Sequence, residues 1–452
     1  MISPGLLISC ETGVTDFRVI PSVEQLRQRE AMRALETRYG RGALLDALRA
    51  ETGALRERLS SGHVGAVTVD EAVAAIDAEA ETLVALSLRI HAHPETAFKE
   101  VQAAGWLTAY LGERGFAVTP GIADLPTAFR AVAGQGAPAV AVLAEYDALP
   151  AIGHGCGHNI IATTAAGAGI GVRAVIERTG GTVHVIGTPA EEIYGGKAPM
   201  IRAGVFDGLD AAIMTHPGTQ DSVTAKALAC AELRGEYFGR EAHAAAQPER
   251  GINALEAMII AFNGINALRQ HIPRTARVHG VITDGGAAPN IVPGHSEASF
   301  LVRAEEDDEL AALKPRVAAC FEAGALATGA RVELHWNENE YQSMRTNMAI
   351  AAAHRRNLAT VGRVVPEDET PRPLGSTDMG NVSKVVPGIH PSIAIAPAEV
   401  NGHSHEFAQY AASESGQRAV IDGAKALAMT AIDILTDAAL RAAARAEFDA
   451  AR

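Results

Sequence analysis

Cysteine is scarce in this chain, and the few cysteines are far apart. Among 452 residues there are only Cys10, Cys156, Cys230 and Cys320. Secreted domains that depend on disulfide bonds carry a denser pattern, so this spacing argues against a disulfide framework. It fits a reducing compartment, and we therefore expect a cytoplasmic protein.

Long apolar runs and basic clusters are also missing. No apolar run approaches the roughly 20 residues that a membrane span needs, and the N-terminus lacks the basic region and apolar core of a secretory signal. Acidic residues outnumber basic ones by 53 to 39, which gives a formal net charge of −14. These absences predict that neither a membrane nor a nucleic acid is a partner. The length fits a soluble protein of two or three domains.

What the chain does have is a cysteine and a histidine two residues apart on a glycine-flanked loop. Residues 155–159 read Gly-Cys-Gly-His-Asn, soon after the apolar run 139–143, which predicts a buried parallel strand. Open α/β sheets place their chemistry beyond the carboxyl ends of such strands. Thiolate and imidazole are ligands for zinc-type metals. Taken alone, the pair is equally compatible with a buried cysteine beside a structural histidine.

Matching ligands recur after later strand-like runs. Glu191 and Glu192 follow the run 182–187, His216 follows 210–214, and His403 follows 397–402. Because parallel strands end at the same edge of a sheet, we expect these side chains to meet there. Two metals and a general base could be supplied by Cys156, His158, Glu192, His216, His403 and the additional carboxylate of Glu191.

The chain divides into four parts. Residues 1–66 are either a helical N-terminal extension of unknown role or the result of a wrongly assigned translation start. Residues 23–59 within this part have helical periodicity. Thr68 and Glu71 form a capping box that predicts a helix running to about residue 91. The sheet domain comprises 67–223 and 341–452, with a final helix over 419–444. The insertion 224–340 has the order βαββαβ of a ferredoxin-like unit, with strands 229–233, 277–282, 297–303 and 331–335 and helices 254–268 and 308–325.

Together these motifs resemble the aminoacylase and carboxypeptidase-like metallopeptidases of family M20, over about residues 68 to 440. Within that family the chain is most similar to the amidohydrolase subfamily, in its aminobenzoyl-glutamate hydrolase and dipeptidase branch. The resemblance is carried, in order, by Ile90–Glu95, Asp147–Pro150, Cys156–Asn159, Pro189–Glu192, His216–Pro217, Ala242–Ala244, Pro289–Pro293, Gly375–Asp378 and His403–Ser404.

The resemblance implies a fold and an activity. The fold is α/β, with a mostly parallel sheet and flanking helices that carry a dinuclear metal site, plus an inserted ferredoxin-like lid and dimerisation domain. The activity is hydrolysis of a C–N amide bond in a small carboxylate-bearing substrate by metal-activated water. Aminobenzoyl-glutamate-like amides, N-acyl amino acids and dipeptides are the candidate substrates. A homodimer or higher homo-oligomer is implied as well.

The resemblance also assigns a metal centre of two divalent ions, zinc or manganese. Cys156 takes the position of the bridging ligand, which is an aspartate in other branches. Glu192 and His403 correspond to the terminal ligands of one ion, and His158 and His216 to those of the other. His405 competes with His403 for the last place, although His403 fits the family's His-Ser spacing better.

Two residues match groups that assist the metal centre. Glu191 matches the general base, which takes a proton from the water and passes it to the leaving nitrogen. Asp147 matches an acid that orients a ligand histidine; the alternative is a turn-capping aspartate before Pro150.

Further residues match substrate contacts. His243 matches a histidine that reaches the neighbouring subunit and polarises the scissile carbonyl, and Asn290 matches an amide donor near it. Arg303 matches the arginine that binds a substrate carboxylate, while Ser376 and Thr377 are expected to line the pocket. The alternatives are an exposed loop histidine for His243 and a surface charge for Arg303.

One departure separates the chain from the N-acyl amino acid branch, which usually carries an aspartate after Cys-Gly-His. Here that position is Asn159, whose side chain is an uncharged amide and supplies no carboxylate. His154 matches no ligand. The alternative enzyme activity is an aminohydrolase that displaces an amine from an activated, possibly aromatic, carbon with the same metal and water. The non-enzyme alternative is an inactive metal-binding homologue.

Overall fold

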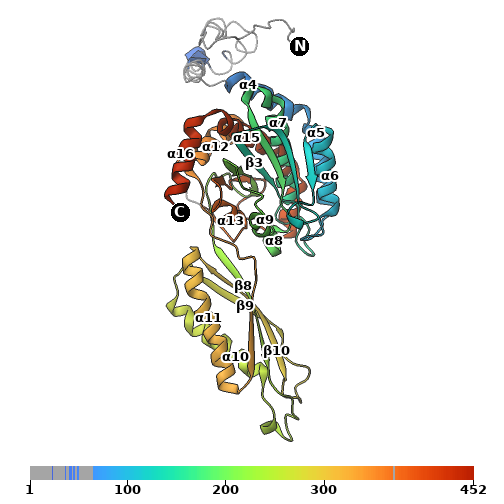
Figure 1. Cartoon of the computed structure of the whole chain (residues 1–452), viewed down its shortest axis with the longest axis vertical. Helices are drawn as coiled ribbons and strands as arrows, with labels where there is room; N and C mark the ends of the chain where they lie inside the picture. Colours follow the sequence, from blue (N-terminus) through green and yellow to red (C-terminus); the bar gives the residue numbers. More distant parts are fainter. Residues whose placement is uncertain are drawn as a thin grey trace.

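The computed structural model describes residues 65–369 and 372–451, with a few isolated positions between 23 and 49. In this part the chain forms two lobes, each built on its own sheet, at opposite ends of an elongated molecule (Figure 1). The helix expected over 23–59 lies largely outside the described residues. The four-part division of the chain stays a prediction.

The larger lobe contains a mixed six-stranded sheet. Its order is β1 (Ala117–Pro120), β2 (Phe129–Gln135), β4 (Gly181–Gly187), β3 (Ala139–Ala144), β5 (Ala211–Ile213) and β13 (Gly388–Ile389). The strands β4, β3, β5 and β13 run parallel, whereas β2 pairs antiparallel with both β4 and β1. The expected mostly parallel sheet is therefore confirmed, because four of its six strands run parallel, and the strands β1 and β2 add an antiparallel edge. The connection from β1 to β2 is too short for a parallel crossover, so this pair forms an antiparallel edge.

Helices cover this sheet and fix its core. The long helix α7 (His158–Thr179) packs against β3, α15 and α4. By length and composition alone α7 could cross a membrane, which corrects the expectation that no run approaches that length. However, 89% of its most apolar window is buried inside the fold. The helix therefore serves as the central core element of the lobe.

Two expected long helices are each broken in two. α4 (Gly65–Ala78) already includes Thr68, so the expected capping box there is wrong, and α5 (Ala80–Ala92) begins after a break at Glu79. At this break the carboxylate of Glu79 forms an ion pair with the guanidinium of Arg114, at 2.7 Å. The expected final helix is divided at Asp437, whose side chain caps the second part by accepting two backbone N–H groups. The halves are α15 (Glu414–Thr436) and α16 (Ala438–Ala450).

The remaining elements of this lobe are short or lie on its surface. They are α6 (Val101–Glu113), η2 (Ile122–Asp124), α8 (Glu191–Tyr194), α9 (Lys197–Arg202), β6 (His216–Gly218), β7 (Ala225–Ala227), α12 (Met348–Thr360), β12 (Arg372–Leu374), α13 (Met379–Ser383), β14 (Ser392–Ala394) and α14 (His405–Ala412). β6 pairs with β14, and β7 pairs with β12, both in parallel.

The smaller lobe confirms the expected βαββαβ order. Its antiparallel sheet has the strand order β11 (Arg331–Trp336), β8 (Ala229–Phe238), β10 (His295–Ala304) and β9 (Arg277–Asp284). The helices α10 (Ala254–Leu268) and α11 (Asp307–Thr328) pack on one face of it (Figure 1), and short turns η3 (Pro248–Arg250) and η4 (Arg269–His271) flank α10.

Strand alternation divides this second sheet into two faces. Leu233, Phe300 and Val302 point to the helices and are fully buried, whereas their neighbours in sequence point away from them. Near the larger lobe this helix-free face carries Cys230, Glu232 and Arg303. The lobes meet there, because Cys230 exchanges both backbone hydrogen bonds with Tyr341 in the returning chain, at 2.8 and 2.9 Å.

Candidate active site

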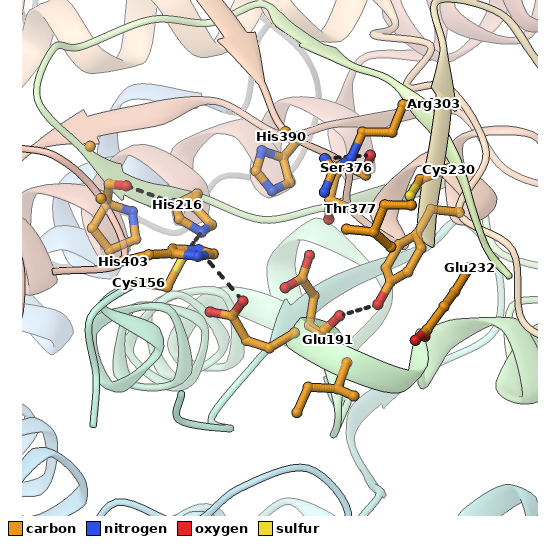
Figure 2. Close-up of a pocket in the computed structure, with 18 of the residues that line it drawn as sticks. Cys156, Glu191, His216, Cys230, Glu232, Arg303, Ser376, Thr377, His390 and His403 are labelled. Carbon is orange, nitrogen blue, oxygen red and sulfur yellow. Dashed lines mark hydrogen bonds and ion pairs between the residues drawn. The ribbon is translucent and has the colours of Figure 1, made fainter. Parts of the chain in front are cut away.

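The expected metal ligands meet at the carboxyl end of the parallel strands. Two groups of potential ligand atoms that share Cys156 form there, one with His158 and His216 and one with Glu192 and His403, while Glu191 forms a further group with His158 and Glu192. Within each group the atoms lie within 4.8 Å of one another. The Cys156 Sγ atom belongs to both groups and lies 3.3 Å from Nε2 of His216 (Figure 2). One thiol is therefore shared between two sets of terminal ligands.

The cysteine loop brings the His-Pro segment close. Gly157 has a φ of 76°, in the left-handed region that favours glycine, and begins α7 as its N-cap. A Cβ atom at this position would lie 2.7 Å from Cγ of Pro217. A side chain at residue 157 would push Pro217, and with it His216, away from Cys156.

Asp147 holds two ligand-bearing segments together. Its Oδ1 atom accepts a hydrogen bond from Nδ1 of His158 at 3.0 Å, and its Oδ2 atom accepts the backbone N–H of Glu192 at 3.0 Å. Both side chains of the Asp147–His158 pair are completely buried. Because Asp147 holds Nδ1, His158 turns Nε2 toward the cluster. Burial disfavours charge on His158, but the Asp147 carboxylate outweighs it and raises its pKa.

His216 also offers Nε2. Its Nδ1 atom lies 2.7 Å from the carbonyl oxygen of Pro217, which can only accept a hydrogen bond, so the ring proton is on Nδ1. Burial, followed by the neighbouring rings of His390 and His158, lowers the pKa of His216. The imidazole is therefore neutral, as a metal ligand must be.

Glu191 and Glu192 are the first two residues of the short helix α8. Successive side chains on a helix diverge by about 100°, which lets adjacent glutamates face different groups. Ala190 before them has a φ of 62°, and its backbone N–H donates to the buried carboxylate of Glu100 at 2.9 Å. Glu100 therefore holds this sharp turn in place, a role that sequence analysis did not assign.

Glu191 is surrounded by carboxylates. Burial first, and then the negative charges of Glu145, Glu192 and Asp378, raise the pKa of Glu191 well above the usual value. Its carbonyl oxygen accepts a hydrogen bond from the Tyr341 hydroxyl at 2.8 Å, which fixes the start of α8 against the chain that returns from the smaller lobe (Figure 2).

Between His403 and His405, only His403 reaches the cluster. Its Nε2 atom lies 3.5 Å from the Glu192 carboxylate, and its side chain is 57% exposed. The backbone has a φ of 57°, and its N–H donates to Gly155 at 2.9 Å, which ties it to the cysteine loop. His405 instead begins α14 and does not line the pocket.

The arrangement fits divalent metals. Nε2 of His158 lies 3.7 Å from Glu145, 3.8 Å from Glu192 and 3.9 Å from Glu191. Ligand atoms bound to one zinc ion stand about 3–4 Å apart, which is the range of these distances. Nε2 of His158 and Oε1 of Glu192 are buried and have no hydrogen-bond partner among the described residues. A bound cation would satisfy them, since thiolate, imidazole and carboxylate suit zinc, and the latter two also suit manganese.

The cluster forms one wall of a cavity of about 510 Å³, and the second lobe forms the opposite wall (Figure 2). Arg303 on β10, Ser376 and Thr377 all line it, as expected. Nη1 of Arg303 donates to the hydroxyl of Ser376 at 3.2 Å, while its Nε is buried and has no partner among the described residues. The alternative of a surface charge for Arg303 is not supported.

Two expected site residues are not in this cavity. His243 and Asn290 lie close together in the smaller lobe, where the N–H of Ala244 donates to the carbonyl of Asn290 at 3.0 Å. Both His243 and Asn290 are exposed. Within one chain they do not meet the metal-ligand cluster.

Several residues near the cluster were missed by sequence analysis. Lys197 is fully buried between Glu145 and Asp378, at 2.5 and 2.6 Å. His390 stacks on His216 with ring centroids 5.3 Å apart, and neither of its ring nitrogens has a partner among the described residues. Glu232 lines the cavity from β8. The sequence around a single charged residue or histidine does not indicate that the residue belongs to a site, because its role depends on partners that are distant in sequence.

Two models of known protein families match parts of the chain. The peptidase dimerisation domain of M20 matches residues 224–328, the part that contains the second sheet. The selenocysteine synthase N terminal model matches residues 17–56, most of which lie outside the described residues.

The chain is also similar to characterised enzymes. It is 41% identical to a mouse Xaa-Arg dipeptidase over 390 residues, which cover 82% of this chain and 90% of the relative. It is 38% identical to one of the p-aminobenzoyl-glutamate hydrolase subunits of Escherichia coli, over 58% of this chain and 59% of that protein.

Among solved structures, a dinuclear metal binding peptidase of the M20 family from Bacillus subtilis superposes with a TM-score of 0.55. At 20% sequence identity it covers 76% of this chain and 98% of its own. This structural similarity supports the fold alone. The assignment to a family rests on the relatives that are similar in sequence.

Proposed function

The chain belongs to the M20 family of metal-dependent amide hydrolases, and we propose that it cleaves the C–N amide bond of a small carboxylate-bearing substrate. Dipeptides come first, because the mouse relative is an Xaa-Arg dipeptidase. Amides of the aminobenzoyl-glutamate type are the second candidate, because the E. coli relative is a subunit of a p-aminobenzoyl-glutamate hydrolase. N-acyl amino acids are the third candidate. The proposed site of action is the cytoplasm, as the free thiols of Cys156, Cys230 and Cys320 suggest.

The observation that carries this proposal is the sharing of Cys156 between two ligand groups. We assign His158 and His216 to one divalent ion, Glu192 and His403 to the other, and Cys156 to the bridge. Zinc or manganese fits these donors. Bound ions would supply Lewis-acid activation of a water molecule and of the scissile carbonyl.

Glu191 is the proposed general base. Burial and the neighbouring carboxylates raise the pKa of Glu191, which makes its carboxylate a stronger base than that of an exposed glutamate. The same group accepts a proton from the water and donates it to the leaving nitrogen. Asp147 contributes indirectly, because it fixes the ring of His158 and the backbone of Glu192.

Arg303 is the proposed anchor for the substrate carboxylate. Its guanidinium lies in the cavity wall opposite the ligand cluster, beside Ser376 and Thr377. An arginine fork binds a carboxylate through two parallel hydrogen bonds, which would orient the amide toward Glu191.

We further propose that the working form is a homodimer. The match to a peptidase dimerisation domain and the exposed position of His243 and Asn290 support it. In a dimer these two residues would approach the cavity of the partner, where a histidine and an amide could donate hydrogen bonds to the scissile carbonyl.

The test combines metal content with turnover. The purified protein is stripped with a chelator, reloaded with Zn²⁺ or Mn²⁺, and analysed for bound metal. It is then incubated with dipeptides, N-acyl amino acids and aminobenzoyl-glutamate, and products are identified by mass spectrometry. We expect about two ions per chain and cleavage of amides only in the loaded form. A protein that binds no metal, or cleaves none of these amides when loaded, would overturn the proposal.

A further inference from the structure

Glu145 carries a carboxylate oxygen that the assigned metal centre does not use. This residue follows β3 directly, and its side chain is completely buried. The ammonium group of Lys197 binds its Oε1 atom at 2.5 Å. Its Oε2 atom is buried as well but has no hydrogen-bond partner among the described residues. Because a buried carboxylate oxygen without a partner is costly, Oε2 calls for a bound group that the protein itself does not supply.

The free oxygen of Glu145 is directed at a ligand histidine. Oε2 lies 3.7 Å from Nε2 of His158, whereas the carboxylates of Glu192 and Glu191 lie at 3.8 and 3.9 Å. That Nε2 atom is also buried and has no partner in the described part of the chain. Ligand atoms bound to one zinc ion stand about 3–4 Å apart. The Glu145 oxygen and the imidazole nitrogen therefore have the spacing of two ligands of the same ion.

The segment after β3 places two carboxylates around the ring of His158. Tyr146, between them, is turned elsewhere, since its hydroxyl donates to the carbonyl of Thr127 at 2.5 Å. Asp147 accepts a hydrogen bond from Nδ1 of His158 at 3.0 Å and so fixes the ring. Glu145 faces the other ring nitrogen, Nε2, which is the atom that a metal would bind.

The neighbouring carboxylates are already occupied or differently placed. Glu145, Glu191 and Asp378 form a group of potential ligand atoms, but the ammonium group of Lys197 is the cation within it. Lys197 binds both oxygens of Asp378, at 2.6 and 2.9 Å. Glu191 lines the cavity, as a base for substrate water must, whereas Glu145 does not. Of these three carboxylates, Glu145 is the one with a free oxygen behind the cavity.

We propose that Oε2 of Glu145 is a fourth protein ligand of the divalent ion assigned to His158 and His216. This inference rests on the proposed function, which assigns that ion. The contact of Lys197 with Oε1 orients the carboxylate, and ligating carboxylates are usually held by such a hydrogen bond.

The two ions then differ in their number of protein ligands. The ion at His158 and His216 has four, counting Cys156, which is the number found in closed structural zinc sites. The ion at Glu192 and His403 has three, as in zinc sites that keep a position open for water or substrate. The side chain of His403 is 57% exposed, so the three-ligand ion is also the more accessible one. The protein should therefore hold the four-ligand ion more tightly.

The first test measures metal affinity rather than turnover. The Zn²⁺-loaded protein is titrated with a chelator, and the bound metal is counted after each addition. Wild-type protein should release its two ions in two steps. Glu145→Gln keeps an oxygen for Lys197 but replaces the free carboxylate oxygen by an amide, and should lower the affinity of the tighter ion by roughly tenfold or more. Glu145→Asp keeps the charge but withdraws the oxygen by one methylene group, and should show the same loss.

The matched control is Asp378→Asn. It removes a negative charge from the same lysine, but neither oxygen of Asp378 is free to bind an ion. The release of both ions should stay close to that of the wild type. Equal losses of affinity in Asp378→Asn and Glu145→Gln would reduce the effect to charge and overturn the inference. Wild-type affinity in Glu145→Asp would overturn it as well.

A crystal structure of the Zn²⁺-loaded wild-type protein gives a result that does not depend on whether the variants fold. Oε2 of Glu145 should lie about 2.0–2.2 Å from one ion. Separations of more than about 3 Å from every bound ion would refute the assignment, because a carboxylate oxygen does not coordinate zinc at that distance.

The two proposals fail differently. A protein whose ion is bound by Glu145 but which cleaves no amide keeps this ligand and loses the proposed function. A protein that cleaves amides while no ion contacts Glu145 keeps the proposed function and loses the ligand.

Discussion

Lys197 and Asp378 are 181 residues apart in sequence and joined by two contacts. The ammonium group of Lys197 lies 2.6 Å from Oδ1 of Asp378, and the backbone N–H of Lys197 donates to Oδ2 at 2.9 Å. The same ammonium group binds Glu145. These three buried charges lie next to Glu191, so they set the electrostatic environment of the proposed base.

Removal of Lys197 should destabilise the fold strongly. Lys197→Met leaves Glu145 and Asp378 buried without their cation, and breaking a buried ion pair in this way costs about 3–5 kcal/mol. The control is Lys425→Met, which removes a pair with the half-exposed Asp77 and should cost at most about 1 kcal/mol. Urea unfolding of both variants provides the comparison, and similar losses would contradict the assigned importance of the buried pair.

The two adjacent glutamates should respond differently to the same substitution. Glu191→Gln should keep the bound metal and the fold but lose most turnover, because Glu191 is assigned as the base and to neither ion. Glu192→Gln should lose metal. Metal analysis and kcat on both variants decide the matter. Loss of metal in Glu191→Gln with an active Glu192→Gln would reverse the two assignments.

Cys156→Ser should lower metal content and activity together. A serine hydroxyl stays protonated near neutral pH and is a poor bridge, whereas a thiol loses its proton on binding a metal. Without a cation, burial raises the pKa of the Cys156 thiol, so the bridge depends on the metal itself. Cys230→Ser is the control, since that thiol lines the same cavity outside both ligand groups. Full metal and full activity in Cys156→Ser would leave Cys156 as a packing residue.

His243 should act in the partner's site. His243→Ala should lower kcat roughly a hundredfold or more without loss of metal, because an oxyanion donor contributes to the chemical step. Mixed dimers of inactive His243→Ala and inactive Glu191→Gln chains should regain activity, since one hybrid site then holds both intact residues. His271→Ala, on the same lobe, should change neither. Mixed dimers that form but stay as inactive as their parents would exclude a shared site.

Acid should destabilise the fold partly through His354. Burial lowers its pKa to about 3, against about 6.5 in an unfolded chain. Between these values the unfolded state binds one proton more than the folded state. The free energy of unfolding therefore falls as the pH drops below 6.5, by about 1.4 kcal/mol per pH unit from this group.

His354→Gln removes this titration, so its unfolding free energy should depend less steeply on pH between 6.5 and 4 than that of the wild type. Urea unfolding at several pH values measures the two slopes. Parallel slopes would show that His354 is not the titrating group.

Local patterns in the sequence were enough for much of the fold. The helix α10 has the bounds expected from its periodicity, because Asn253 caps its start through two backbone N–H groups. The apolar runs that precede Cys156, Glu192 and His216 form strands whose carboxyl ends meet, so strand order and spacing alone were enough to group the candidate ligands. The two broken helices were not foreseen, because the breaks at Glu79 and Asp437 interrupt no apolar periodicity.

The sequence by itself determined which residues alternate on each strand, where most strands end, and which thiol, imidazole and carboxylate groups follow them. Tertiary structure alone decided that Lys197 is held between Glu145 and Asp378, and that His390 stacks on His216. It also turned Glu232 toward the cavity rather than toward solvent. The physical reason is that periodicity and capping act between near neighbours in the chain, whereas the charge environment of a buried group depends on strand register and on which distant segments pack beside it.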